Sequence, residues 1–244
     1  MAKYITIDIG NSSAKAVAWV DGEMMGEPTL GALCAADVHH LAAEIGGKFD
    51  AAAICSVSDD AAGLALAAGQ VSDKVIEVTT STPLPIDISA YASTLGADRI
   101  AALAAVADIC PGREALVVDC GTAITLDRLS AKGEFLGGNI SPGVGMRLRA
   151  MHAFTKRLPE VASTDNTPLW GLNTDDAMRS GALRGAIAEI EYYAGNCPAG
   201  TVVAITGGRA RSIASMLSFK PEIADAALVL RGLKHIIEYN EKVK

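Results

Sequence analysis

Two aspartate-x-glycine turns are the first residues in this chain whose spacing could support chemistry. Asp8-Ile9-Gly10 and Asp119-Cys120-Gly121 each follow an apolar run and precede small polar residues. Glycine has no Cβ, so backbone N–H groups in such a turn can approach phosphate oxygens closely. A carboxylate near phosphate is repelled unless a cation lies between them. One such turn is common in hairpins, but the pair predicts a phosphate and metal site built from two similar halves.

Polar side chains around both turns could supplement the backbone donors. They are Asn11, Ser12, Ser13, Thr122 and Thr125, and Lys15 could add a positive charge. The Gly-x-x-x-x-Gly-Lys-Ser/Thr motif is absent, because Gly46-Gly47-Lys48 is followed by Phe49. The pattern therefore favours transfer of a phosphoryl group from ATP to a small hydroxyl compound.

The segment Gly96-Ala97-Asp98-Arg99 lies between the two turns, at the expected start of a helix. A carboxylate there is kept ionised by the positive end of the helix dipole and could accept the proton of a substrate hydroxyl. Arg99 could bind an anionic substrate group through two hydrogen bonds. The alternative is that Asp98 is only an N-terminal helix cap, as acidic residues often are.

Hydrophobic runs and turn residues predict an α/β protein in which each half opens with a strand, a turn and a second strand. We expect strands at 3–9, 15–20, 50–56, 74–78, 115–119, 124–126, 133–140 and 201–206. We expect helices at 36–46, 59–69, 96–108, 174–195, 209–218 and 227–240, and one that has Pro142 in its first turn. The halves are 1–110 and 111–244, and the final helix could pack back on the first half.

Composition limits the class of protein. The 244 residues carry a formal net charge of −7, which argues against nucleic acid as a partner. No apolar run reaches the roughly 20 residues needed to span a bilayer, and the start lacks the apolar region of a signal peptide. The five cysteines are scattered without zinc-ligand spacing. These observations predict a reduced, cytoplasmic protein.

Several motifs together resemble the type III pantothenate kinases, in the order seen in that family and over nearly the whole chain. The motifs are Asp8-Ile9-Gly10-Asn11-Ser12, Gly96-Ala97-Asp98-Arg99, Asp119-Cys120-Gly121-Thr122-Ala123, Gly137-Gly138-Asn139-Ile140-Ser141-Pro142-Gly143, Asn173-Thr174 with Ala177-Met178-Arg179-Ser180-Gly181, and Thr206-Gly207-Gly208.

The resemblance implies phosphorylation of pantothenate at its primary hydroxyl, the first step of coenzyme A synthesis. It implies a duplicated actin-like (ribonuclease H-like) two-domain kinase fold with the active site in the interdomain cleft. It also implies a homodimer that uses ATP, Mg²⁺ and a monovalent cation, K⁺ or NH₄⁺.

The resemblance also implies roles for individual residues. Asp98 matches the general base, and Asp119 matches the ligand of the monovalent cation. The expected ATP-binding residues are Asp8, Ile9, Gly10, Asn11, Ser12, Ser13, Ala14, Lys15 and Thr122. The expected substrate contacts are Tyr91, Gly96, Ala97, Asp98, Arg99 and Thr174, the last near the dimer interface.

One stretch departs from the family pattern. Tyr91 is followed by only Ala92-Ser93-Thr94-Leu95 before Gly96, a shorter segment than is usual and without proline. Tyr91 is therefore either a substrate contact or a packing residue with its hydroxyl in water. Two other functions stay open: a related kinase of another small alcohol or sugar, and a non-catalytic nucleotide-binding regulator with the same fold.

Overall fold

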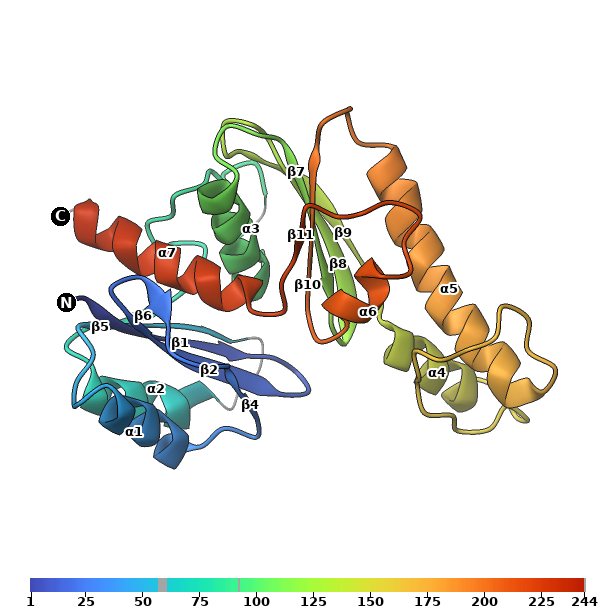
Figure 1. Ribbon diagram of the computed structural model, residues 1–244, viewed down its shortest axis with the longest axis horizontal. Coiled ribbons are helices and arrows are strands. Elements are labelled where there is room, and N and C mark those ends of the chain that lie inside the picture. Colours follow the sequence, from blue (N-terminus) through green and yellow to red (C-terminus); the bar gives the residue numbers. More distant parts are fainter. Residues whose placement is uncertain (57–60, 92, 244) are drawn as a thin grey trace. The chain divides into compact units, whose positions relative to one another are not determined.

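The structure is a computed structural model that describes residues 1–56, 61–91 and 93–243 (Figure 1). The chain forms two compact units. Unit 1 contains 1–113, 129–136 and 227–244, and unit 2 contains 114–128 and 137–226. The division into domains at residue 110 stays a prediction, and the units place the C-terminal segment with the first half of the chain.

Strands and helices are interspersed along the chain. The strands are β1 (Lys3–Ile9), β2 (Ala14–Val20), β3 (Glu23–Met24), β4 (Thr29–Gly31), β5 (Ala51–Ser56), β6 (Val75–Glu77), β7 (Ala115–Cys120), β8 (Ala123–Leu129), β9 (Phe135–Pro142), β10 (Val202–Thr206) and β11 (Ile223–Ala224). The helices are α1 (Ala35–Glu44), α2 (Ala61–Val71), α3 (Ala97–Ile109), α4 (Val144–Ala153), α5 (Thr174–Gly195), α6 (Ala210–Ala214) and α7 (Leu228–Lys242).

The sheet of unit 1 has the strand order β3-β2-β1-β5-β6, and β4 pairs with β2. β1 and β2 form the expected antiparallel hairpin, whose ladder places Asp8 opposite Lys15. β5 runs parallel to β1 on its other side and places Cys55 opposite Asp8. The end of β1 is thus flanked on both sides by strands that bring side chains towards Asp8.

Helices cover both faces of this sheet (Figure 1). α1 and α2 pack against one face, where apolar residues such as Ile7, Ile54 and Leu64 form a buried core. α3 and α7 pack against β1 and β5 from the other face and against each other. A Cβ on Gly232 of α7 would collide with the backbone carbonyl of Ala101, so glycine is what allows these two helices to approach so closely.

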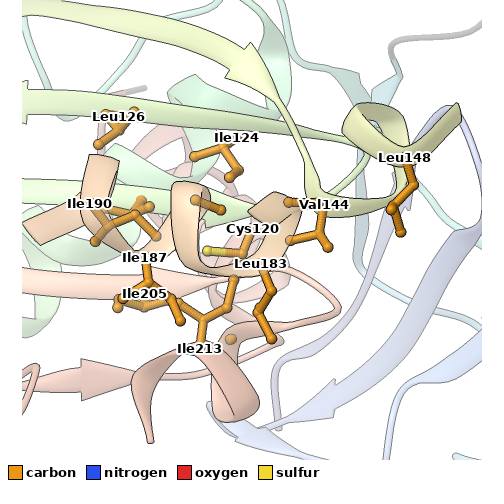
Figure 2. Close-up of a cluster of buried hydrophobic side chains, with 14 of the residues drawn as sticks. Cys120, Ile124, Leu126, Val144, Leu148, Leu183, Ile187, Ile190, Ile205 and Ile213 are labelled. Atoms are coloured by element: carbon orange, nitrogen blue, oxygen red, sulfur yellow. The ribbon is translucent and has the colours of Figure 1, made fainter. Parts of the chain in front are cut away.

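The second sheet has the order β11-β10-β7-β8-β9, in which β10 runs parallel to β7. Figure 2 shows the core of unit 2, in which strand residues such as Ile124 and Ile205 meet Leu183 and Ile187 of α5. α5 has the predicted bounds because Asn173 caps it, with its side chain accepting a hydrogen bond from the Asp176 N–H.

Some elements differ from the expectation: the helix expected at 209–218 is the shorter α6, and the short strands β3, β4 and β11 were not expected. Pro142 is the last residue of β9 rather than a first-turn residue of α4, because Gly143 in extended conformation is the cap of that helix. The predicted helix at 59–69 includes residues 59 and 60, which lie outside the described residues. No helix in the described part of the chain combines the length and the apolar character needed to cross a membrane.

Candidate active site

Asp8 lies near the end of β1, where its carboxylate Oδ1 accepts a hydrogen bond from the thiol of Cys55 at 3.4 Å. Burial raises the pKa of Asp8 above its ordinary value of 3.8, and the negative charge of Asp98 raises it further. The positive charge of Lys15 and the hydrogen bond from Cys55 lower this pKa and so oppose the rise. Burial raises the pKa of the Cys55 thiol well above 9.0, and the nearby Asp8 and Asp98 raise it further. The thiol therefore stays protonated at neutral pH and acts as the donor.

Three of the predicted residues of unit 1 lie near one another. Asp8, Lys15 and Asp98 come from β1, β2 and α3, respectively, and both other charges act on Asp8. Two carboxylates and one ammonium leave a local excess of negative charge. Such a site favours a bound cation, which would relieve the repulsion between the carboxylates.

The link between β1 and β2 is a tight turn in which the Gly10 N–H donates to the Ser13 carbonyl at 3.1 Å. A Cβ on Gly10 would lie only 3.1 Å from the same oxygen. Asn11, Ser12 and Ser13 are exposed, whereas Ile9 and Ala14 on either side are buried. The sequence therefore places polar donors at the tip of the turn and anchors both of its ends in the core.

Asp98 lies in the first turn of α3, and Gly96 is the N-cap. Its Oδ1 accepts a hydrogen bond from the Arg99 N–H at 2.8 Å, and a Cβ on Gly96 would lie 2.5 Å from that oxygen. Asp98 is therefore not the cap residue. The glycine two positions earlier leaves space for the carboxylate, in this side-chain conformation, at the positive end of the helix.

Arg99 and Tyr91 come together in unit 1. Arg99 is only 6% exposed, and its guanidinium carbon lies 5.7 Å from the centre of the Tyr91 ring. The Tyr91 ring is 37% exposed. The short segment after Tyr91, of which Ala92 lies outside the described residues, is thus long enough to bring the tyrosine beside the Gly-x-Asp-Arg element.

The second aspartate-x-glycine turn, in unit 2, is closely packed against two other glycines. A Cβ on Gly207, whose φ is +93°, would collide with the Asp119 carboxylate and lie 2.7 Å from the Cys120 carbonyl carbon. A Cβ on Gly143 would overlap the Gly121 carbonyl oxygen and lie 2.6 Å from the Thr122 oxygen. The Gly143 N–H donates to the Thr122 carbonyl at 3.1 Å. Three separate segments therefore pack closely at this turn, because Gly143 and Gly207 carry no Cβ that would collide with it.

Thr206 adds an oxygen to this turn. It pairs with Asp119 in the β7–β10 ladder, so the two side chains share one face of the sheet. Thr206 is 1% exposed, and its hydroxyl has no hydrogen-bond partner within the described structure. A carboxylate and a hydroxyl are oxygen donors of the kind that hard cations prefer. The residues therefore fit a cation held by few protein ligands, and the described residues contain no cluster of three His, Cys, Asp or Glu that could hold one alone.

Comparison with known proteins decides the family. Residues 4–196 match the model of the type III pantothenate kinases. A protein named type III pantothenate kinase from Bacteroides fragilis is 37% identical over 97% of this chain and 98% of its own length. One of the same name from Porphyromonas gingivalis is 34% identical over 98% of this chain and 100% of its own.

The chain belongs to the type III pantothenate kinase family. It is accordingly a kinase, and its resemblance to this family at the level of sequence motifs is confirmed.

Solved structures confirm the fold. A protein described as a Baf family transcriptional activator from Campylobacter jejuni has a TM-score of 0.64 at 24% identity and covers 98% of this chain and 99% of its own. A protein described as a 2-dehydro-3-deoxygalactonokinase from Sinorhizobium meliloti has a TM-score of 0.60 at 16% identity, with 98% and 99% covered. The chain thus has the expected duplicated actin-like α/β fold, with one sheet in each unit.

The predicted site residues of this family member fall into two groups. Unit 1 holds the first ATP loop, Asp98, Arg99 and Tyr91, and unit 2 holds Asp119, Thr122 and Thr174. Thr174 is exposed and is the first residue of α5.

Sequence reasoning missed three residues that contact the predicted site. Cys55 belongs to an apolar run that predicts a buried strand, but its place beside Asp8 depends on the register of β5 against β1. Thr206 was noted only as part of a glycine motif. Phe135, whose ring contacts Tyr91 and Arg99, had no signal in the sequence beyond its place in a strand.

Proposed function

We propose that this chain phosphorylates pantothenate at its primary hydroxyl with ATP, yielding 4′-phosphopantothenate and ADP in the first step of coenzyme A synthesis, with Asp98 as the general base. The observation that carries the proposal is the position of Asp98 in the first turn of α3, where its charge acts on Asp8. Membership of the type III pantothenate kinase family supports the choice of substrate.

The reaction needs a group that removes the hydroxyl proton of the acceptor. In the proposed step that proton passes to the Asp98 carboxylate while the hydroxyl oxygen forms a bond to the γ-phosphorus of ATP. The bond between the γ-phosphorus and its bridging oxygen breaks, and ADP leaves with the electron pair. The hydrogen bond from the Arg99 N–H in the first turn of α3 orients the Asp98 carboxylate for this task.

The loops of both units are proposed to contact ATP. In unit 1 they are residues 8–15, with the Lys15 ammonium opposite Asp8, and in unit 2 they include Thr122. Mg²⁺ would neutralise charge on the phosphate oxygens when bound, and the Asp8 carboxylate, with Asp98 nearby, is an oxygen ligand that suits it. We assign the monovalent cation, K⁺ or NH₄⁺, to Asp119, whose carboxylate shares its face of the sheet with the unpartnered Thr206 hydroxyl.

Pantothenate is proposed to contact Tyr91, the segment from Gly96 to Arg99, and Thr174. Arg99 suits the carboxylate of pantothenate because a guanidinium can donate two parallel hydrogen bonds to it. The family resemblance further implies a homodimer acting in the cytoplasm, and the five free cysteines agree with a reducing compartment. Light scattering of the purified chain would test the dimer.

A coupled assay of ADP formation tests the function. We expect ADP to form with Mg²⁺ and K⁺ only when pantothenate is added, and Asp98→Asn to lower kcat by about 100-fold or more. Asp108→Asn is the matched control, because it removes the same charge from the far end of α3, where Asp108 pairs with His235. Equal turnover by Asp98→Asn and the wild-type chain would refute the assignment of the base.

The same assay separates the alternative functions. A panel of hydroxylated compounds would reveal a kinase of another alcohol or sugar, because the best acceptor would then differ from pantothenate. A regulator would bind ATP but form no ADP with any acceptor.

A further inference from the structure

Phe135, the first residue of β9, joins two parts of the proposed substrate site in unit 1. Its ring centre lies 5.2 Å from that of Tyr91 in an edge-to-face arrangement with an interplanar angle of 85°. The Arg99 guanidinium carbon lies 6.0 Å from the Phe135 ring centre. Because Arg99 also contacts the Tyr91 ring, the three side chains form a closed triangle of contacts.

The backbone at Phe135 also holds the loop that carries Tyr91. The Phe135 N–H donates to the Asp87 carbonyl at 2.7 Å, and the Asp87 N–H donates to the Gly133 carbonyl at 2.8 Å. Within that loop the Tyr91 N–H donates to the Ile88 carbonyl at 3.0 Å. The start of β9 therefore fixes the loop by its main chain and the tyrosine by its ring.

Phe135 is more buried than Tyr91, which suits a role in holding the other two side chains in place. Phe135 is 3% exposed, so its ring is held by its surroundings, whereas Tyr91 at 37% is open on one side. The electron-rich face of an aromatic ring attracts a guanidinium, and edge-to-face packing restricts the second ring. A ligand binds more tightly to side chains that are already held in place, because less conformational freedom is lost.

We propose that Phe135 is a positioning residue for pantothenate recognition, which holds the Arg99 guanidinium and the Tyr91 ring where the substrate meets them. This inference rests on the proposed function, since it assumes that Tyr91 and Arg99 contact the acceptor. Phe135 acts through those two side chains rather than on the reacting atoms.

A purely structural role for Phe135 would have a different consequence. A core phenylalanine contributes buried apolar area, so its loss lowers stability without preferring one substrate over another. Phe49 supplies the comparison, because it is fully buried in the core of the same unit, packed among residues of β1, β5 and α1.

The experiment compares steady-state constants of Phe135→Leu and Phe49→Leu in the full-length chain. We expect Phe135→Leu to raise the KM for pantothenate about tenfold, with the KM for ATP and kcat much less affected. Phe49→Leu should lower the melting temperature and leave the KM for pantothenate unchanged. Phe135→Tyr keeps the ring and should retain a KM for pantothenate near that of the wild type.

The outcomes separate this inference from the proposed function. An unchanged KM for pantothenate in Phe135→Leu, or an equal rise in Phe49→Leu, would overturn the positioning role while the function stands. If Phe135→Leu does not fold, Phe135→Met decides in the same way, because a flexible apolar chain fills the space without a ring face. A wild-type chain without pantothenate-dependent turnover would overturn both.

Discussion

The Cys55 thiol donates a hydrogen bond to the Asp8 carboxylate across two parallel strands, with 3.4 Å between Sγ and Oδ1. Cys55 is buried, and its thiol pKa is raised by burial and by Asp8 and Asp98, so it keeps its proton. A donor that cannot ionise at neutral pH orients the carboxylate without adding charge. The same hydrogen bond lowers the pKa of Asp8 and partly offsets the effect of burial.

Cys55→Ala should raise the Mg²⁺ concentration that the enzyme needs for activity. Without the thiol, the Asp8 carboxylate loses a donor and its pKa rises further, so we expect the Mg²⁺ concentration for half-maximal rate to increase about fivefold. Cys55→Ser should stay near wild type, because a hydroxyl can also donate to the carboxylate. Titration of the rate with Mg²⁺ measures both variants.

Ile76→Val provides the control for the space left by the sulfur atom. It removes one methyl group from β6, which pairs with the same β5 strand, where Ile76 lies opposite Ala53 rather than Cys55. An equal increase in the Mg²⁺ concentration for half-maximal rate in Ile76→Val and Cys55→Ala would show that packing, rather than the hydrogen bond, causes the effect.

Asp8→Asn should make the unliganded protein more stable while removing its activity. Burial, followed by the charge of Asp98, raises the folded-state pKa of Asp8 above the ordinary 3.8, despite the opposing effect of Lys15. The folded state then holds the proton more strongly than the unfolded state does. Stability of the wild-type chain therefore falls as pH rises from about 3.8 through the raised pKa, and the asparagine variant avoids this loss.

Melting temperatures of both proteins, measured without nucleotide or metal between pH 4 and pH 8, test this sign. We expect the advantage of Asp8→Asn to be largest at the upper end of that range and to shrink towards the lower end. Its kcat should fall by about 100-fold or more, since the phosphate-binding cation loses a charged ligand. A variant less stable than wild type at pH 8 would contradict the desolvation argument.

The parts of the fold that follow from local pattern could be predicted from the sequence. The β1–β2 hairpin has apolar strands on both sides of a polar turn. Helix α5 begins directly after an asparagine cap, which marks its first residue. Asp8 and Asp98 could be selected because their residue types and spacing suit phosphate chemistry. That these two residues lie near each other could be known only once the structure placed β1 and α3 in the same unit.

Contacts between distant segments could not be predicted in the same way. Phe135 meets Tyr91 because Glu134, the residue before β9, forms a bridge with Asp87, and nothing local to either segment encodes that pairing. The thiol of Cys55 faces Asp8 through strand register, which periodicity alone leaves undetermined. The departure after Tyr91 also gave no sign that the ring would still reach Arg99.

Gly232→Ala should destabilise unit 1 strongly. A Cβ at this position of α7 would overlap the Ala101 carbonyl of α3, and a rigid backbone group can yield only if the helices separate. We expect a loss of about 3 kcal/mol in the free energy of unfolding, measured with urea. In Gly63→Ala of α2, the new Cβ meets no atom of the described residues within 4 Å, so this change should instead stabilise the protein by about 0.5–1 kcal/mol. An unchanged free energy of unfolding in Gly232→Ala would contradict the close contact between α3 and α7.

Gly207→Ala should disrupt the second aspartate-x-glycine turn and lower activity while the protein stays folded. Its φ of +93° is unfavourable for alanine, and the new Cβ would displace the Asp119 carboxylate and press on the Cys120 backbone. Displacement of a proposed cation ligand by about 1 Å can lower catalysis about 100-fold, so we expect that loss in kcat/KM for ATP. Gly112→Ala is the matched control, because its φ of +75° carries similar backbone strain while a Cβ there meets no atom within 4 Å. It should lower stability by about 1 kcal/mol and leave the rate intact. If both variants lose activity equally, strain in the turn rather than the collision with Asp119 is responsible.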